Sequence, residues 1–369
     1  MLTLEKRHMR TVAHRNQAGI ALIIVMISVT VLGILAAAFA YSMKVETKLA
    51  QNANSETDLI LLGRSGVDRA SHILAQQMAL GCEPYDSLNQ VWAGGGGGPC
   101  TSNSVLAGIS LKDYQLGDGK FSLTITDLER KYNINITDEA ALQQALRLVG
   151  VDAGELSGIS GSILDWIDPD DNTHIGGTES DYYQGLTPPY FAKNKPIDDL
   201  SELLLVRGVT PEIYWGGVAT NHQRGAFQNQ LGRVGPGFEA AVYPVGLSDL
   251  FTPISNGRIN INTASVTTLQ MVPMIDENIA ARIIEYRNEG EGFVSSMPIG
   301  SPGKTIASAL LNAGMNPNVI PQVERYFTVR SSTFEVQVDA EIAGYKRQFF
   351  AILARNSPRD VQVLNFYWK

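Results

Sequence analysis

The sequence predicts an α+β fold in which one long N-terminal helix packs on an antiparallel sheet and a large, mostly helical domain is inserted between the strands. Three observations indicate this. Residues 20–80 contain no proline and change from apolar to amphipathic. Alternating apolar and polar residues, typical of strands, occur at residues 120–137 and again after residue 324. The long stretch between them is mainly helical in pattern.

The helix begins with a stretch that fits a membrane anchor. Ile20–Ala40 is uncharged, lacks proline and is about 21 residues long, so as a helix it spans roughly 30 Å, the thickness of a bilayer's hydrocarbon core. A secretory signal peptide has a shorter apolar region and a small-residue cleavage site soon after it, which excludes that class of leader. Basic residues precede the stretch and predict a cytoplasmic N-terminus: Lys6, Arg7, Arg10 and Arg15.

The same helix is predicted to continue well beyond the apolar stretch. Mostly apolar residues recur every three or four positions as far as Leu80, among them Val45, Leu49, Ile60, Val67 and Leu74. We expect one helix of about 60 residues, roughly 90 Å long. Its second half has one apolar face and is suited to lie against a sheet.

Five strands are predicted for that sheet. Residues 121–127 and 132–137 alternate, with a short turn between them. Three further strands follow at the C-terminus, at residues 326–342, 345–355 and 361–368. Turn residues separate these three strands, Ala343-Gly344 and Asn356-Ser357-Pro358. The pattern of two strands, a helical stretch and three strands predicts one antiparallel sheet that carries an insertion.

The two cysteines follow the membrane stretch. Cys82 and Cys100 form an even pair, and in an oxidising periplasm we expect them to make one disulfide, with two free thiols as the alternative. Between them, Gly94–Gly98 is a run of five glycines. A phosphate-binding loop would be followed by Lys-Ser or Lys-Thr and a helix start, and these are lacking. The pattern therefore favours a flexible loop closed by the disulfide.

A weak internal repeat lies inside the helical stretch. Residues 133–143 and 260–270 align without gaps and share Asn-Ile-Asn at their start and Leu-Gln at their end. Each copy is a short extended piece that enters a helix, with Asn, Thr or Asp near the N-cap. The second copy continues to residue 293 in a pattern that resembles a helix-hairpin-helix unit of DNA-binding proteins.

That likeness supplies the main rival function, an exported DNA receptor of a competence system. Such hairpins bind a phosphate with backbone N–H groups in a glycine-containing turn. The turn here, Pro273–Asp276, has no glycine and adds a carboxylate. Arg282 and Arg287 are surrounded by Glu277, Glu285, Glu289 and Glu291, so the hairpin is about neutral or acidic. Phosphate affinity needs net positive charge, and we expect no nucleic-acid partner.

An acidic loop is a candidate Ca²⁺ site. Asp168, Asp170 and Asn172 stand at alternate positions, as the first ligands of an EF-hand loop do, and Glu179 is at the twelfth position. Two further carboxylates, Asp171 and Asp181, lie nearby in the sequence. The sixth position is Thr173 rather than glycine, so a true EF-hand is not matched. Hard oxygen donors without cysteine favour calcium over zinc. The alternative is an Asp-rich turn that binds no metal.

Catalysis is not expected. Beyond residue 19 the histidines are His72, His174 and His222, and none lies beside a nucleophile in a recognisable motif. The net charge of −8 would become about −11 on removal of residues 1–19, and such a surface repels nucleic acid and anionic lipid. Residues 221–257 are glycine-rich and irregular, and we assign them no role.

Two parts of the chain carry a family resemblance. Gln17-Ala18-Gly19 meets the apolar stretch abruptly at Ile20, and this junction resembles the class III signal of type IV pilins and type II secretion pseudopilins. The segment 162–217, with Asp-Trp-Ile-Asp-Pro-Asp-Asp, then Asp-Tyr-Tyr, Pro-Pro-Tyr, Ser-Glu-Leu and Arg-Gly, is similar to the minor pseudopilin K family. The fifth residue after the junction is Ile24, where most pilins have glutamate, and this departure is also typical of that family.

The resemblance implies processing, organisation and partners. A prepilin peptidase would cut between Gly19 and Ile20 and methylate the new amine. The domains would be a leader (1–19), a transmembrane and amphipathic pilin helix (20–80), a pilin-like α/β domain (81–137 and 324–369) and an inserted α domain similar to SAM and helix-hairpin-helix domains (138–323).

By the same resemblance the protein would be a calcium-binding minor pseudopilin at the tip of the type II secretion pseudopilus. It would sit in the bacterial inner membrane as a single-pass protein with a periplasmic C-terminal domain. Its partners would be minor pseudopilins I and J, other pseudopilins, the prepilin peptidase and the inner-membrane secretion platform. The alternatives are the exported DNA-binding protein considered above and a minor subunit of a related type IV pilus.

Overall fold

The structure is a computed structural model that describes residues 18–217, 243–295 and 304–368. The chain divides into two units, residues 1–60 and 61–369, and each is described by itself. The predicted basic leader, with Lys6, Arg7, Arg10 and Arg15, lies outside the described residues, as does much of the connector 221–257.

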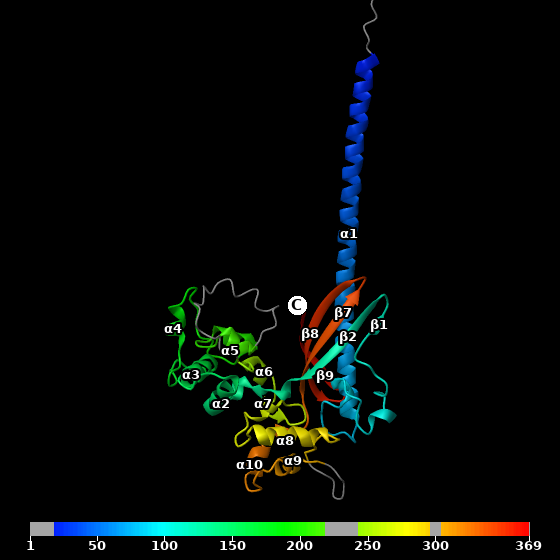
Figure 1. The fold of residues 1–369 in the computed structure, drawn as a ribbon. Helices are drawn as coiled ribbons and strands as arrows, with labels where there is room; N and C mark the ends of the chain where they lie inside the picture. The colour runs from blue at the N-terminus through cyan, green and yellow to red at the C-terminus, as the bar shows by residue number, and fades with distance from the viewer. Residues whose placement is uncertain (1–17, 218–242, 296–303, 369) are drawn as a thin grey trace, which may run out of the picture. The chain divides into compact units, whose positions relative to one another are not determined.

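The first unit holds most of helix α1 (Ala18–Ala79), which Figure 1 shows as one continuous helix. Its large apolar side chains from Ile20 to Leu49 are exposed. Among the described residues this is the helix long and apolar enough to cross a membrane. The prediction of a single helix over residues 20–80 is confirmed.

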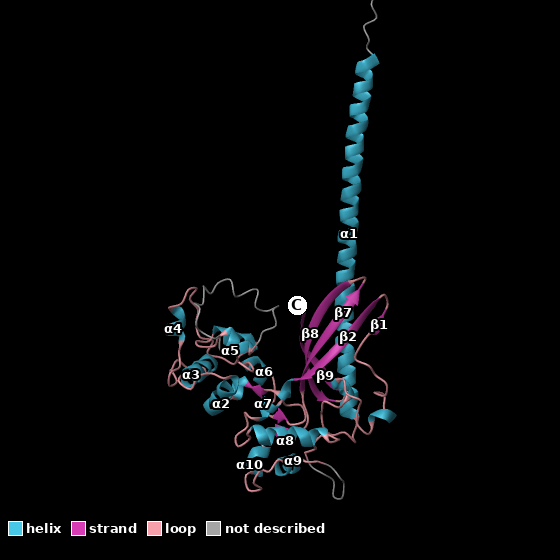
Figure 2. Ribbon diagram, viewed as in Figure 1, coloured by secondary structure: helices cyan, strands magenta, loops and turns pink. Residues whose placement is uncertain are grey.

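The second unit contains a five-stranded antiparallel sheet with the order β1-β2-β7-β8-β9 (Figure 2). The strands are β1 (Tyr114–Leu116), β2 (Gly119–Asp127), β7 (Thr333–Ile342), β8 (Tyr345–Ser357) and β9 (Asp360–Trp368). The β7–β8 turn has left-handed backbone at Ala343 and Gly344, as a two-residue hairpin requires. Because β2 and β7 are paired along their whole length, the insertion leaves and re-enters the sheet at one place.

The last turns of α1 pack on the buried face of this sheet. A Cβ at Gly63 would lie 2.6 Å from the ring of Phe349, and one at Gly66 would lie 2.4 Å from Val338 Cγ1. The two glycines therefore let the helix backbone approach the strands closely. This is the packing that the amphipathic second half of the helix predicted, and the α+β fold class is confirmed.

Two strand predictions were wrong in part. Residues 132–137 were expected to form one strand of the sheet, but only β3 (Tyr132–Asn133) is extended, and it pairs in parallel with β4 (Phe251–Thr252) outside the sheet. The Asn133 side chain accepts the N–H of Asn135 at 2.9 Å and turns the chain into the 3-10 helix η4 (Ile134–Ile136). The edge strand β1, which is only three residues long, was not predicted.

The expected strand over residues 326–342 is divided. Its beginning, β6 (Phe327–Thr328), pairs in parallel with β5 (Ile259–Asn260), and β7 starts after a break. The remaining helices are η1 (Val91–Ala93), η2 (Thr101–Asn103), η3 (Leu128–Arg130), α2 (Glu139–Val149), α3 (Leu156–Ile167), α4 (Ser180–Gln184), η5 (Leu200–Leu205), α5 (Pro211–Trp215), α6 (Leu247–Leu250), α7 (Val266–Leu269), α8 (Glu277–Asn288), α9 (Ile306–Asn312) and α10 (Ile320–Glu324).

The described residues of the insertion form two apolar cores. The first core joins α2, α3, η5, α5 and α6 through residues such as Leu146, Ile163 and Leu203. The second joins α8, α9 and α10 through residues such as Ile283 and Leu310. We call these parts the first and second helical modules, and Figure 1 shows α2–α5 and α8–α10 as two groups.

The internal repeat corresponds to these two modules. In each copy the first asparagine accepts the backbone N–H two residues further on. The second asparagine binds both backbone groups of one distant residue. Asn135 donates to the carbonyl of Ile197 at 3.0 Å and accepts its N–H at 2.7 Å, and Asn262 does the same with Phe293 at 3.0 and 2.7 Å. The repeated Asn-Ile-Asn thus fastens a remote segment to each module.

Candidate functional site

The acidic loop joins α3 to α4 and is folded around one buried carboxylate. Asp165, in the last turn of α3, is fully buried and accepts the backbone N–H groups of His174, at 2.8 Å, and Thr178. A Cβ at Gly177 would lie 2.1 Å from Asp165 Oδ2, so the loop can close over the carboxylate only with glycine there. Asp165 therefore fixes the course of residues 168–179.

Three potential metal ligands meet at this carboxylate. The ligand atoms of Asp165, Asp168 and His174 all lie within 4.8 Å of one another, and this group could hold a metal ion. His174 Nδ1 is 2.6 Å from Asp165 Oδ1 and 3.5 Å from Asp168 Oδ2. Sequence reasoning missed Asp165, because it is part of an apolar helix and not of the loop. A lone aspartate between Leu164 and Trp166 was the available signal.

Several oxygen atoms beside this group are buried and have no hydrogen-bond partner among the described residues. They are Asp168 Oδ1, both carboxylate oxygens of Glu179, and Asn194 Oδ1. Burying an unpaired acceptor costs about 1–3 kcal/mol, and more when it is charged. A bound cation would satisfy such atoms, and oxygen donors of this kind suit Ca²⁺. The donor set of the loop thus fits the metal that its sequence predicted.

The other predicted ligands lie in the same loop but are partly engaged. Asp170 Oδ1 accepts the N–H of Asn172 at 2.8 Å and its side-chain amide at 2.7 Å. Asp171 Oδ1 accepts the side-chain amide of Asn194 at 2.8 Å. Asp181 is exposed in the first turn of α4. Asn194 itself was not predicted, and its left-handed backbone (φ 47°), which asparagine tolerates, was not visible in the sequence.

Crowded carboxylates change the acid–base behaviour of the loop. Burial raises the pKa of Glu179 to about 7, and the nearby charges of Asp165 and Asp168 add to this effect. Burial and Asp170 also raise the pKa of Asp168. The loop therefore holds more negative charge than its own donors can stabilise, which a cation would relieve.

Comparison with known proteins places this loop in a family. The family model described as "Type II secretion system (T2SS), protein K" matches residues 122–215, which include the whole loop, and a helix-hairpin-helix model matches residues 255–297. The type II secretion system protein K of Aeromonas hydrophila is 25% identical over 380 residues, which cover 95% of this chain and 96% of that protein. The chain is therefore similar to type II secretion system protein K over nearly its whole length.

Further relatives and one structure agree. The protein K of Pseudomonas aeruginosa is 24% identical over 286 residues, covering 76% of this chain and 75% of that protein. The match to the protein K of Klebsiella pneumoniae, 25% identical, spans only 61% of that protein and 54% of this chain. The crystal structure of the GspK-GspI-GspJ complex from enterotoxigenic Escherichia coli has the same fold, with a TM-score of 0.61, 18% identity, and coverage of 87% of this chain and 99% of that one.

Packing explains at least one residue of the glycine run. Cys82 and Cys100 are joined by a disulfide, with their Cα atoms 6.5 Å apart. Glu83, fully buried inside the closed loop, accepts the N–H of Cys100 at 3.2 Å and the amide of Gln77 at 2.8 Å. A Cβ at Gly98 would lie 2.4 Å from the Glu83 carboxyl carbon. At least this glycine is needed to wrap the loop around a carboxylate of the protein itself.

The hairpin of the second helical module is poorly suited to phosphate. Its Arg287 donates to the carbonyls of Ile261 at 3.2 Å and Ala264 at 2.9 Å, so this guanidinium is used inside the fold. At the start of α8 the Asp276 carboxylate accepts the N–H of Ile279 at 2.8 Å, in the place that a phosphate would take. These contacts oppose the DNA-receptor interpretation.

Proposed function

We propose that this protein is a minor pseudopilin at the tip of the type II secretion pseudopilus, where it initiates or caps assembly. The observation that carries the proposal is the match to a protein K over nearly the whole length of both chains. The fold provides the two parts that such a subunit needs. One is an apolar helix that continues onto a sheet, and the other is a bulky insertion.

The residues at the start of α1 support a tip position. In a filament of pilin-like subunits, a glutamate at the fifth mature position can neutralise the terminal amine of a neighbour, because an unpaired charge in an apolar surrounding costs several kcal/mol. Ile24 provides no such carboxylate. A subunit with nothing ahead of it has no amine to neutralise. The insertion joins the sheet beside the end of α1, where Arg355 of β8 donates to the Leu74 carbonyl, and its bulk would prevent another subunit from stacking there.

Processing and partners follow from the same proposal. We infer cleavage between Gly19 and Ile20 by a prepilin peptidase, a single inner-membrane span, and a periplasmic C-terminal part. The solved complex contains GspK with GspI and GspJ. We infer that this chain likewise assembles with minor pseudopilins I and J, then with the other pseudopilins and the secretion platform. In domain terms the leader is 1–19, the pilin helix 20–80, the α/β domain 81–137 with 324–369, and the inserted α domain 138–323.

Calcium has a structural role in this proposal. Asp168, Glu179 and Asn194 would supply the unpartnered oxygens, and Asp165 would hold the loop in place beside them. The further donors of the loop would be Asp170, Asp171, Asn172 and Asp181. The ion would supply positive charge, and the residues would hold the loop between α3 and α4 in one arrangement. The orphaned, buried oxygens support this more strongly than the spacing of the carboxylates does.

Localisation of the insertion tests the tip position. Gold-labelled antibodies against the insertion should mark one end of isolated pseudopili, and a strain that lacks the chain should fail to export its type II substrates. The matched comparison is an antibody against the major pseudopilin, which should mark the whole length. Gold along the whole length with the insertion antibody would contradict the tip position while leaving the family assignment intact.

A further inference from the structure

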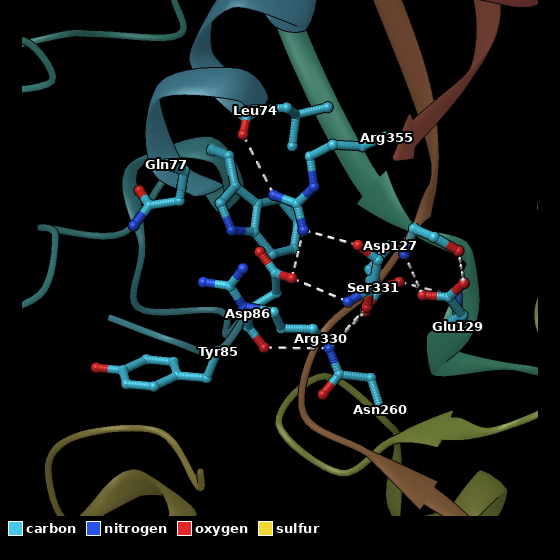
Figure 3. Close-up of polar contacts among 12 residues, drawn as sticks. Leu74, Gln77, Tyr85, Asp86, Asp127, Glu129, Asn260, Arg330, Ser331 and Arg355 are labelled. Carbon is cyan, nitrogen blue, oxygen red and sulfur yellow. Dashed lines mark hydrogen bonds and ion pairs between the residues drawn. The ribbon is translucent and has the colours of Figure 1, made fainter. Parts of the chain in front are cut away.

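A buried polar cluster lies where the insertion leaves β2 and returns to β7 (Figure 3). We call it the splice cluster. Its carboxylates and its guanidinium are at most 2% exposed. It consists of Asp86, Asp127, Glu129, Asn260, Ser331, Ser332 and Arg355. These residues come from the loop after α1, from the end of β2, from η3, from β5 of the second module, from the entry to β7 and from β8.

Asp127 is saturated with donors. Its Oδ2 accepts from the side chains of Asn260 at 3.0 Å, Thr263 at 2.6 Å and Ser331 at 2.7 Å. Its Oδ1 accepts the N–H of Glu129 at 2.8 Å. Four donors stabilise the ionised form, and a proton on Asp127 would require one of them to turn away.

Glu129 is placed differently. Its two short hydrogen bonds come from one residue, the N–H and the hydroxyl of Ser332, each at 2.6 Å. A neutral carboxylic acid can keep both contacts. Its carbonyl oxygen still accepts the N–H, and its O–H donates to the hydroxyl oxygen. Protonation of Glu129 therefore needs no rearrangement of the backbone.

The splice cluster holds more carboxyl groups than positively charged groups that pair with them. Arg355 pairs with Asp86 and also donates to the carbonyl of Ser331 at 2.7 Å. Among the described residues, no cation pairs with Asp127 or with Glu129. Arg330 donates to a carbonyl and faces Asp86, and Lys131 donates to a carbonyl and faces Asp249 and Glu335. Two buried carboxyls thus lie side by side without a counter-ion.

We propose that the splice cluster is a proton-dependent clasp, in which Glu129 takes up a proton in mildly acidic surroundings and so tightens the hold of the insertion on the sheet. The contact between Glu129 and Ser332 joins η3, which directly follows β2, to the residue that directly precedes β7. The clasp therefore acts on both ends of the insertion together. It does not depend on the metal site or on the position of the subunit in a filament.

The raised pKa values of Glu129 and Asp127 support a tighter contact at lower pH. Burial, followed by the neighbouring charge of Asp127, raises the pKa of Glu129 to about 7, and burial raises the pKa of Asp127 to about 6. An acid whose pKa is raised in the folded state stabilises the fold below its unfolded pKa, near 4.5, and this stabilisation is lost as the pH rises through about 7. The clasp should thus be tighter at pH 5 than at pH 8.

Hydrogen exchange of the full chain in detergent tests the clasp. Peptides covering residues 127–132 and 327–335 are followed by mass spectrometry from pH 5 to 8.5, with rates corrected for the pH dependence of intrinsic exchange. Protection should fall by up to about tenfold per pH unit between pH 5 and 7 and then level off. Protection that stays constant across this range would overturn the proposal.

Three variants identify the titrating group. Glu129→Gln is neutral and keeps an acceptor for Ser332, so its profile should be flat above about pH 6, where Asp127 is ionised, and should keep only the contribution of Asp127 below that pH. Ser332→Ala removes a donor that favours the ionised form, so the midpoint should move to higher pH, which a merely structural contact would not cause. The control Glu285→Gln, on the exposed side of α8, should keep the wild-type profile. A wild-type slope in Glu129→Gln, or an unmoved midpoint in Ser332→Ala, would refute the role of Glu129.

Discussion

Arg355 of β8 and Asp86 of the loop after α1 form an ion pair that is almost completely buried, although they are 269 residues apart in the sequence. The guanidinium also lies over the ring of Phe334, 4.7 Å from its centre, and donates to the Leu74 carbonyl at 3.3 Å. One side chain therefore ties together the last turns of α1, the loop that follows it and the sheet.

Loss of Arg355 should destabilise the second unit severely. Arg355→Ala would leave Asp86 buried without its partner, which costs about 3–5 kcal/mol. Thermal unfolding of the full chain in mild detergent, followed by near-UV circular dichroism, should show a clearly lower midpoint. The double variant Asp86→Asn with Arg355→Met should be less destabilised than Arg355→Ala alone. Equal midpoints for wild type and Arg355→Ala would show that the pair contributes nothing.

Strong periodicity made α1 and most of the sheet predictable. The helix has an unbroken pattern over residues 20–80, and β2, β7, β8 and β9 alternate along their lengths. Residues 132–137 alternate equally well and yet turn after two residues, because Asn133 offers its side chain to the backbone in place of a sheet partner. The alternation of apolar and polar residues does not reveal a local hydrogen bond from a side chain to the backbone.

The candidate metal site could be predicted from the sequence only in its loop. The spacing of the sequence proposed Asp168 and Glu179 as ligands, but Asp165 is part of a helix, and Asn194 follows Glu179 by a further 15 residues. Only the tertiary fold brings these residues to the loop. The internal repeat was likewise predictable only in part. Its alignment showed two similar segments, but not that each segment binds a distant residue, Ile197 or Phe293, in a separate helical module.

Maturation at Gly19 gives a further prediction. A peptidase that cuts after this residue must accept backbone without a large side chain, so Gly19→Trp should remain uncut. Mass spectrometry of the wild-type protein should show a chain that begins with N-methylated Ile20. The control Ala18→Ser should be processed normally. Normal cleavage of Gly19→Trp would refute the proposed site.

The disulfide should form in the periplasm and should stabilise the loop around Glu83. Closing a loop of about 19 residues is worth about 3 kcal/mol by the chain-entropy estimate. Cys82→Ser combined with Cys100→Ser should therefore lower the unfolding midpoint, as should reduction of the wild type. Mass spectrometry after thiol alkylation without reductant should find no labelled cysteine. Two labelled cysteines in material from the periplasm would reject the bond.

Calcium should stabilise the first helical module, since an ion that binds only the folded loop raises the free energy of unfolding by mass action. We expect chelation to lower the unfolding midpoint of the full chain, Ca²⁺ to restore it, and Mg²⁺ to restore it poorly, because Mg²⁺ demands a stricter geometry and gives up its water reluctantly.

Variants of the loop should reproduce the effect of chelation. Asp168→Ala with Glu179→Ala removes three unpartnered oxygens, so this protein should melt at one temperature with or without calcium and should support less secretion. Its cleavage after Gly19 should be unchanged, because that site lies in another unit of the chain. Asp152→Asn, on an exposed carboxylate just after α2, is the matched control and should respond to calcium as the wild type does. If the wild type melts identically in chelator and in millimolar calcium, the loop is an Asp-rich turn that binds no metal.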